Sequence, residues 1–461
     1  MTYDNTFLGT EPLGKLLRRL AIPTVAAQVI NMLYNIVDRI YIGHMPGDGS
    51  LALTGVGVCL PLIMIISAFA QLVGSGGAPR ASIAMGKGDN DEAERILGSC
   101  FTALFVLAVL LTAVILIGNR AFLLAFGCSE NTIEYAVDYM SIYAIGTIFV
   151  QMTLGMNSFI TAQGYTTVSM KTVLIGAVCN IILDPICIFV LGLGVKGAAL
   201  ATIISQAVSA VWVVFFLCGK KSLLNLKFKY FRIKPKIILP CIALGLSPFI
   251  MQSTESLISV CFNSSLLKYG GDTAVGAMTI LTSVAQFILL PVQGITQGSQ
   301  PIISYNYGAG NTSRVKDTFF LLVKVCLGWT MLTWLLVMVF PQIFASIFTS
   351  DAALIDFTKT ALRIYLGAMG LFGIQMACQM TFVSIGNAPC SIIVAIVRKF
   401  VLLLPLIYIM PQMIADKTMG VYTAEPVADV IAVTFTAVLF AVQFKKALKA
   451  LTIENSKKPT Q

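Results

Sequence analysis

Long runs of apolar residues, separated by short polar stretches, dominate the pattern of this sequence. A helix needs about 20 apolar residues to cross the hydrocarbon core of a bilayer, and the runs have that length. The Gly and Pro residues within them are compatible with membrane helices, where they often mark kinks. We predict twelve spanning helices, over residues 16–43, 51–77, 96–119, 133–161, 168–191, 197–218, 238–267, 274–304, 316–340, 357–384, 391–413 and 419–444.

The composition leads to the same fold class. Of the 461 residues, 57% are hydrophobic and 11% are charged, whereas soluble domains contain about 25% charged residues. A soluble core of this size would not bury so many apolar side chains. We therefore predict an all-α polytopic membrane protein, which excludes a soluble enzyme, a nucleic-acid-binding protein and a disordered chain.

Basic residues are distributed unevenly between the two sets of loops. The net charge is +10, and most Lys and Arg residues lie in the N-terminal segment, the even-numbered loops, the stretch 220–236 and the C-terminal tail. Because cytoplasmic loops are enriched in Lys and Arg, we predict a multi-pass protein of the cell inner membrane with both termini in the cytoplasm. This topology signal explains the basic runs better than a nucleic-acid site or a specific lipid site.

Residues that commonly bind metals or catalyse reactions are scarce. The single histidine, His44, falls in a predicted outer loop, and nearly all of the 11 cysteines lie within apolar runs without a CxxC spacing. We interpret the cysteines as small buried apolar residues. We therefore expect no cofactor, no enzymatic activity and no disulfide framework.

The two halves of the sequence resemble each other. Pro79 and Gly86 recur 222 residues later as Pro301 and Gly308, and other prolines and glycines match in the same order. Two six-helix lobes of the same orientation explain these matches, with a symmetry axis along the membrane normal. The predicted domains are an N-lobe at 1–219, a basic cytoplasmic linker at 220–236, a C-lobe at 237–446 and a cytoplasmic tail at 447–461.

Polar residues within a membrane span are costly and mark candidate functional sites. In the fifth span, Asn180 and Asp184 are four residues apart and face one side of the helix. Pro185 cannot donate a backbone hydrogen bond, which leaves spare oxygen acceptors beside the carboxylate. We expect Thr202 and Asn157 to add oxygens from neighbouring spans. Such a set suits Na⁺ or a proton, and the alternative is a structural hydrogen bond at a proline kink.

We single out charged residues in three further spans. Asp38, late in the first span, either belongs to the cation site or pairs with Arg39. Glu255 in the seventh span has no evident partner in its own helix, which leaves functional and structural roles open. Arg398 and Lys399 in the eleventh span either extend to the membrane surface or pair with a carboxylate, and we assign them no transport role.

These features together resemble the MATE (multidrug and toxic compound extrusion) family, and within it the bacterial branch typified by the staphylococcal drug exporter. The resemblance covers nearly the whole chain. It rests on twelve helices in two halves, the Pro…Gly-x-Gly loops after helices 2 and 8, the Asp of the first span and the Asn-x-x-x-Asp-Pro of the fifth. It implies the MATE/flippase-superfamily fold and a monomer, embedded in membrane lipid, that exports cationic amphipathic small molecules in exchange for H⁺ or Na⁺.

The resemblance also implies which residues bind the coupling ion. The N-lobe cation site of prokaryotic members corresponds to four positions that would also ligate Na⁺ in a sodium-coupled exporter: Asp38, Asn180, Asp184 and Thr202. Other branches use an acid in helix 7 and one in helix 10, but the matching part of helix 10 has no carboxylate here. For a substrate site or secondary ion site the candidates are Tyr34, Asn157 and Glu255.

The mechanism that we expect is antiport by alternating access. The drug enters between the lobes, where apolar and aromatic walls tolerate varied shapes. In the outward-open state H⁺ or Na⁺ neutralises the carboxylates and releases the drug. One cation moving inward cancels the cost of moving one positive charge outward, about 2.3 kcal/mol per 100 mV. The alternative is a flippase for a lipid-linked oligosaccharide, which belongs to the same superfamily and requires a cationic cavity.

Overall fold

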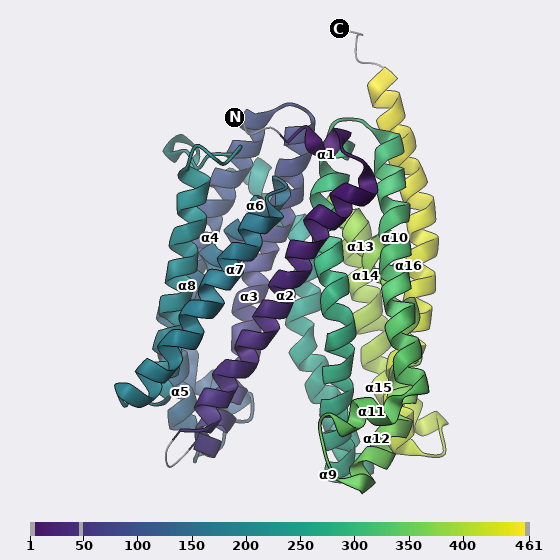
Figure 1. Cartoon of the computed structure of the whole chain (residues 1–461). Helices are drawn as coiled ribbons and strands as arrows, with labels where there is room; N and C mark the ends of the chain where they lie inside the picture. Colours follow the sequence, from purple (N-terminus) through teal and green to yellow (C-terminus); the bar gives the residue numbers. More distant parts are fainter. Residues whose placement is uncertain (1–4, 46–48, 457–461) are drawn as a thin grey trace.

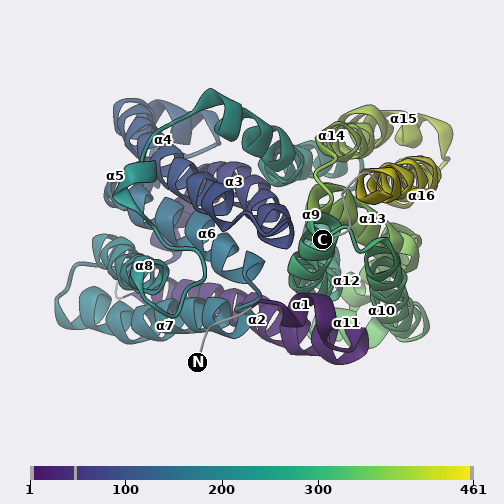
Figure 2. The ribbon, with the colours of Figure 1, turned by 90° about the horizontal axis from the view of Figure 1, so that it is seen from above.

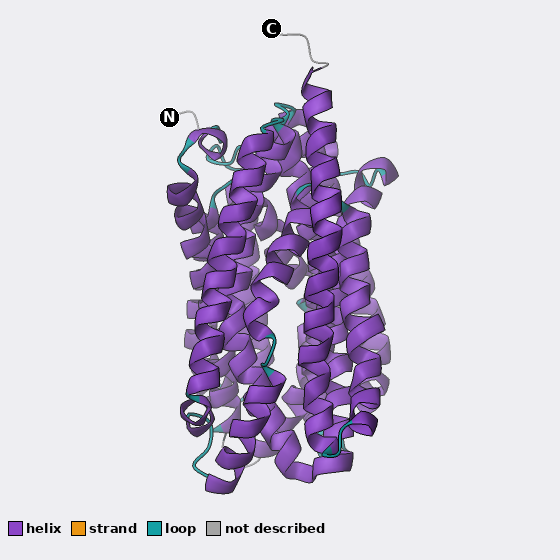
Figure 3. Cartoon of the chain, turned by 90° about the vertical axis from the view of Figure 1, so that its right-hand side faces the viewer, coloured by secondary structure: helices purple, strands orange, loops and turns teal. Residues whose placement is uncertain are grey.

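A computed structural model describes residues 5–45 and 49–456, and all regular elements in these ranges are helical. Figure 3 shows long helices that run in roughly one direction and are joined by short loops. The first half contains α1 (Phe7–Thr10), α2 (Leu13–Gly43), α3 (Gly49–Gly86), α4 (Asn90–Ala125), α5 (Ile133–Ile145), α6 (Thr147–Ala162), α7 (Thr166–Pro185), η1 (Ile186–Val190) and α8 (Val195–Cys218).

A short 3₁₀ turn, η2 (Phe228–Tyr230), lies in the basic segment between the halves. The second half contains α9 (Pro235–Gly308), α10 (Thr312–Val339), α11 (Pro341–Ser346), α12 (Ala352–Tyr365), η3 (Met369–Leu371), α13 (Phe372–Ser384), α14 (Ala388–Ile396), η4 (Val397–Leu403), α15 (Leu404–Met413) and α16 (Lys417–Ser456). Both η1 and η4 are π-helical segments, each following directly on an α-helix.

Each predicted span corresponds to a helix, to part of a helix or to a bent helix pair. Within the described ranges, nine helices are long and apolar enough to cross a membrane, and the bent pairs α5–α6 and α12–α13 raise the number to eleven. The 74 residues of α9 exceed one crossing, and the chain changes direction within it at Gly271, where φ is 64°. Glycine adopts such a positive φ without strain. The backbone is not helical at this residue, so α9 divides there into the seventh and eighth spans.

Some helices extend further than the apolar runs predict. The second span was expected to end at residue 77, but α3 continues to Gly86, and α16 continues to Ser456 instead of ending at 444. A residue in the left-handed conformation commonly ends a helix. Gly88 has this conformation just after α3, with a φ of 80°. The predicted C-terminal tail is correspondingly helical as far as Ser456.

Corresponding helices of the two halves begin 222 residues apart, the separation of the matching motifs in the sequence. Helices α4, α7 and α8 begin at residues 90, 166 and 195, and α10, α14 and α16 begin 222 residues later, at 312, 388 and 417. Two of the N-caps repeat as well. The Asp89 carboxylate accepts from the Glu92 backbone N–H at 2.9 Å, and the Asn311 side chain accepts from that of Arg314 at 3.1 Å. The local chemistry that starts a helix is thus shared by both halves.

We call α2–α8 (Leu13–Cys218) the N-terminal group and α9–α16 (Pro235–Ser456) the C-terminal group. Figure 2 shows the two groups side by side. In Figure 1 they approach each other at the end that contains α1 and the last turns of α16, and they diverge toward the other end. We refer to the first of these as the α1 end.

Glycines let the two groups touch through their backbones at the α1 end. A Cβ atom on Gly86 would lie 2.0 Å from the carbonyl oxygen of Tyr305, and one on Gly308 would lie 2.0 Å from that of Ile83. The two contacts are related by the repeat, as in a two-fold symmetric interface. Nearer the middle of the molecule, the rings of Phe69 and Phe249 meet edge to face at 5.0 Å.

Apolar cores lie inside each group. One core of the C-terminal group surrounds Phe262 and Tyr422, and one core of the N-terminal group surrounds Tyr139. A third core, around Phe159, also includes Ile237 of α9 and so joins the groups near the α1 end. This core therefore packs the two groups together at the end where they approach each other in Figure 1.

The short helix α1 contacts both groups. Leu8 is fully buried, and its carbonyl oxygen accepts from Asn306 Nδ2 at 2.9 Å and from Arg314 Nε at 3.1 Å, both in the C-terminal group. On the other side, the ring of Phe7 lies against Gly164, in the loop between α6 and α7. The segment before the first span thus bridges the two groups.

Candidate functional site

The predicted cation site lies inside the N-terminal group, where α2, α7 and α8 meet. Asn180 and Asp184 are one turn apart on α7 and are fully buried, and Thr202 on α8 is nearly so. The α-helix ends at Pro185, and the chain continues as the π-helical η1. The proline and the wider turn that follows place the carboxylate at an interruption of the regular backbone pattern.

Asn180 links the oxygens of the site. Its Nδ2 donates to Asp184 Oδ1 at 3.2 Å and to Thr202 Oγ1 at 3.4 Å, while Thr202 itself donates to the Ala198 carbonyl at 3.0 Å. The amide therefore orients both neighbours and leaves its own oxygen free. These bonds connect side chains on two successive turns of α7 with one on α8.

Asp38 on α2 completes the group. Its carboxyl lies within hydrogen-bonding reach of the Asp184 carboxyl. Two carboxylates so close repel each other unless a proton or a cation lies between them, so they titrate as a pair. The alternative partner, Arg39, is exposed and forms no ion pair with Asp38 among the described residues.

Three oxygens of this cluster are buried without a hydrogen-bond donor: Asp38 Oδ1, Asn180 Oδ1 and Asp184 Oδ2. Buried polar atoms are nearly always paired in folded proteins, and these three acceptors from neighbouring residues could hold a cation. Oxygen ligands of this kind suit a hard metal cation, and the carboxylate pair suits a proton.

Aromatic hydroxyls border the cluster. Tyr34 lies one turn before Asp38 and is close enough to interact electrostatically with both carboxylates. Tyr139, which was not among the predicted residues, has its hydroxyl near that of Thr202, and its ring stacks on that of Tyr143 with the ring centroids 6.1 Å apart. The available signal was the spacing of these two tyrosines, which places both on one face of the fourth span.

Asn157 lies elsewhere, contrary to our expectation that it would add an oxygen. Its Nδ2 donates to the Ser169 carbonyl at 3.3 Å. Ser169 is three turns from Asn180 on α7, which is about 16 Å along the helix axis. The bend between α5 and α6 directs this part of the fourth span toward the α1 end.

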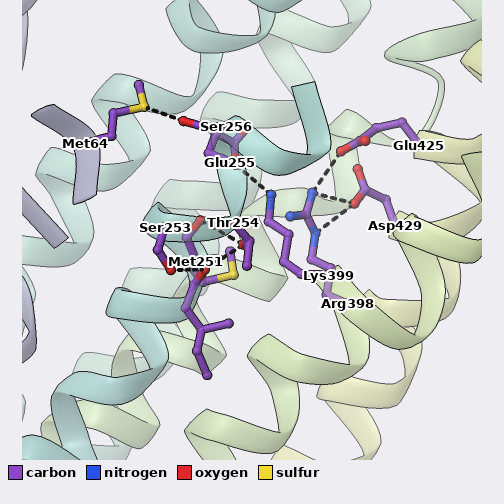
Figure 4. Close-up of polar contacts among 11 residues, drawn as sticks. Met64, Met251, Ser253, Thr254, Glu255, Ser256, Arg398, Lys399, Glu425 and Asp429 are labelled. Carbon is purple, nitrogen blue, oxygen red and sulfur yellow. Dashed lines mark hydrogen bonds and ion pairs between the residues drawn. The ribbon is translucent and has the colours of Figure 1, made fainter. Parts of the chain in front are cut away.

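A second cluster of charges is buried in the C-terminal group, in the corresponding helices (Figure 4). Arg398 on η4 donates through Nε and Nη2 to Asp429 Oδ1 at 3.0 and 2.9 Å, and through Nη2 to Glu425 Oε1 at 3.0 Å. Its guanidinium also lies 4.5 Å from the centre of the Phe372 ring. Of the two roles left open for Arg398, the structure shows the pairing with carboxylates.

Glu425 and Asp429 were not among the predicted residues. They are four residues apart, like Asn180 and Asp184, and a proline lies in the same turn, although Pro426 follows the first polar residue and Pro185 follows the second. That signal was present in the twelfth predicted span, 419–444, but the two acids were not singled out there.

Glu255 has its partner in a different helix. Its Oε2 lies 2.6 Å from Lys399 Nζ. The side chain of Lys399 is 4% exposed, whereas that of Glu255 is 58% exposed. The next residue, Ser256, donates to the Met64 sulfur on α3 at 3.5 Å, so Glu255 lies on the side of the cluster that faces the N-terminal group.

No group of three or more His, Cys, Asp or Glu residues suited to a metal ion occurs in the part of the chain that the structure describes. The cation cluster of the N-terminal group is of another kind, because two carboxylates are joined there by an amide and a hydroxyl. Its donor set favours an alkali cation or a proton over a transition metal.

Relatives of this chain are found over most of its length. The multidrug export protein MepA of Staphylococcus haemolyticus (strain JCSC1435) is 24% identical over 396 residues, which cover 86% of each chain. The protein of the same name from Staphylococcus aureus (strain N315) is 23% identical over 399 residues, which cover 87% of each.

Solved structures share the fold. A crystal structure of MATE in the bent conformation superimposes with a TM-score of 0.91 at 22% identity, covering 98% of this chain and 100% of that one. The outward-facing conformation of a multidrug resistance MATE family transporter of the MOP superfamily gives 0.88 at 23% identity, covering 98% and 99%.

The family profile matches twice. The MatE profile matches residues 23–186 and 248–409, so that the two segments begin at Pro23 and Pro248, near the starts of the first and seventh spans. Together the segments include most of the chain. They contain the residues of both clusters except Thr202 on α8 and Glu425 and Asp429 on α16. The chain therefore belongs to the MatE family.

Proposed function

We propose that this protein exports cationic amphipathic small molecules through the cell membrane in exchange for H⁺ or Na⁺. The observation that carries the proposal is the set of three buried, unpaired oxygens on Asp38, Asn180 and Asp184. The MepA relatives are named multidrug export proteins, which supports an organic substrate. The unit of transport is the monomer, because one chain supplies all three helices of the cluster.

The orientation that we propose has the α1 end in the cytoplasm. Lys15, Arg18 and Arg19 line a shallow surface pocket of about 390 Å³ at this end of α2, where they would face anionic headgroups and the cytoplasm. The groups touch at the α1 end and diverge at the other. In this orientation the described conformation is outward-facing, the state in which an external cation reaches Asp38 and Asp184.

A lipid-linked oligosaccharide flippase is less well supported. It would need unpaired cations at membrane depth to hold a pyrophosphate. The intramembrane cations of the eleventh span are already occupied, since Arg398 binds Glu425 and Asp429 and Lys399 binds Glu255.

Ethidium flux in proteoliposomes tests the proposal, with an imposed pH gradient and then an imposed Na⁺ gradient. We expect one gradient to drive ethidium transport in the wild type. Asp184→Asn removes the charge that the coupling ion neutralises, so it should abolish gradient-driven flux while the protein remains folded. Asp138→Asn is the matched control, because Asp138 is an exposed acid that pairs with Lys196 on the surface. Gradient-driven flux in Asp184→Asn equal to that of the control would refute the site.

A further inference from the structure

The two charged clusters occupy equivalent helices but differ in what balances the carboxylates. In the N-terminal group, acids on α2 and α7 have unpaired oxygens. In the C-terminal group, the acids on α9 and α16 are bonded to Arg398 and Lys399 of η4. Where one group has carboxylates with unpaired oxygens, the other contains cations that are part of the chain.

The π-helical turn explains how two adjacent cations reach one cluster. Consecutive residues of an α-helix point in clearly different directions, but a π-helix has more residues per turn and separates them by a smaller angle. η4 spans Val397–Leu403, and both Arg398 and Lys399 are buried within it. The segment thus directs both side chains to the same interior side.

The two cations are held very differently. Arg398 makes three hydrogen bonds to two buried carboxylates and stacks on Phe372, a planar and rigid arrangement. Lys399 is a flexible point charge bonded to one carboxylate oxygen, on Glu255. Of the two, Lys399 is the one whose contact a competing cation can replace.

Glu255 is open to such a competitor. More than half of its side chain is exposed, on the side of α9 that faces Met64 of α3. With all five groups ionised, three carboxylates oppose two cations, and the cluster has one uncompensated negative charge. An organic cation between the groups would be attracted to Glu255, the exposed member of the cluster.

We propose that Lys399 is a tethered cation. While no drug is bound, its ammonium group occupies the position beside Glu255 that the positive charge of a bound substrate would take. This inference rests on the proposed function for its substrate class. Drug binding is then an exchange of one ammonium-like charge for another, and Lys399 is an internal competitor that sets the affinity for cations. The exchange also keeps Glu255 paired in both states, so that its charge is never left without a counter-ion.

Equilibrium binding of tetraphenylphosphonium, a permanent monovalent cation, to the purified full-length protein tests this inference without any ion gradient. Lys399→Met removes the competitor and should lower the Kd about tenfold, which corresponds to about 1.4 kcal/mol. Lys399→Arg keeps a cation and should show no such gain. Lys324→Met, which removes an exposed lysine of α10, is the matched control and should bind like the wild type.

The carboxylate is tested by Glu255→Gln, which should raise the Kd at least about tenfold, and by the double variant with Lys399→Met, which should bind as weakly as Glu255→Gln alone. The uncharged triphenylphosphine oxide should bind all variants alike. Lys399→Gln keeps an N–H donor for Glu255 and replaces Lys399→Met if that variant does not fold. Unchanged or weaker cation binding in Lys399→Met and Lys399→Gln, or a gain that persists without Glu255, would overturn the inference even if transport is coupled as proposed.

Discussion

Single glycines determine how closely the two groups approach each other. At Gly86 the backbone of α3 lies so close to that of α9 that a methyl group would be 2.0 Å from the Tyr305 carbonyl oxygen. This neighbour is backbone and cannot rotate away as a side chain can. The equivalent glycine, Gly308, has the same relation to Ile83.

Gly86→Ala should therefore destabilise the described conformation by about 1–3 kcal/mol, the usual cost of inserting a methyl group into a tightly packed contact. Gly57→Ala is a matched control on the same helix, because a Cβ there meets nothing within 4 Å. Thermal unfolding in detergent should show a lower transition temperature for Gly86→Ala than for Gly57→Ala. Equal transition temperatures would contradict the close contact.

Residue by residue, the sequence predicted which side chains lie close together where a motif was local. Asn180, Asp184 and Thr202 are brought together as expected, because helical spacing and the proline specify the face of α7. The pairing of Lys399 with Glu255 spans 144 positions and depends on how α9 packs on η4. No periodicity along one helix contains that information.

At the scale of elements, helix N-caps are repeated between the two halves. Asp89 and Asn311 each accept a hydrogen bond from the backbone three residues later, at the first turns of α4 and α10. An N-cap contributes about 1 kcal/mol to its helix. Since the two caps have the same geometry, their removal should have the same effect in both groups.

Asp89→Ala and Asn311→Ala should each speed hydrogen exchange about fivefold in the first turn of their own helix, which corresponds to about 1 kcal/mol. Mass spectrometry of peptides covering 90–94 and 312–316 measures this. Asp89→Asn retains an acceptor oxygen and serves as the control, with exchange close to that of the wild type. If either alanine variant exchanged like Asp89→Asn, the cap would contribute nothing there.

The number and order of helices were predictable because apolar length alone sets a membrane span. Breaks inside the spans were not. The bend of 57° between α5 and α6, and the π-helical segments η1 and η4, arise where neighbouring helices impose a local path on the backbone. The hydropathy of a segment does not depend on its neighbours and so does not predict these breaks. Gly146, at the bend between α5 and α6, is the one local sign of a break that we recognise.

At the scale of the whole molecule, alternating access requires the contact at the α1 end to open. A direct link between the groups, halfway along α2, is the bond from Gln28 Nε2 on α2 to Gln297 Oε1 on α9, at 3.0 Å. Thr24 adds a second link from its hydroxyl to the Gly294 carbonyl, at 2.6 Å. Both links would have to break for the substrate to enter from the cytoplasmic side.

Joining Gln28→Cys and Gln297→Cys with a short bis(methanethiosulfonate), which binds each thiol through a disulfide, should therefore stop ethidium transport, and reduction of the disulfides should restore it. The background replaces by serine the native cysteines that are not buried, Cys179, Cys218 and Cys261. Each single variant treated with the reagent is the control and should remain active. Continued transport by fully cross-linked protein would show that this contact does not open during the cycle.

The bridging position of α1 determines where the protein tolerates an added domain. Phe7 and Leu8 are wedged between the loop at Gly164 and the C-terminal group, so a bulky fusion partner attached directly ahead of them would press on a joint that must move. The last turns of α16 instead rise clear of the neighbouring helices (Figure 1). A fluorescent reporter attached there would move with the C-terminal group and would not touch α1.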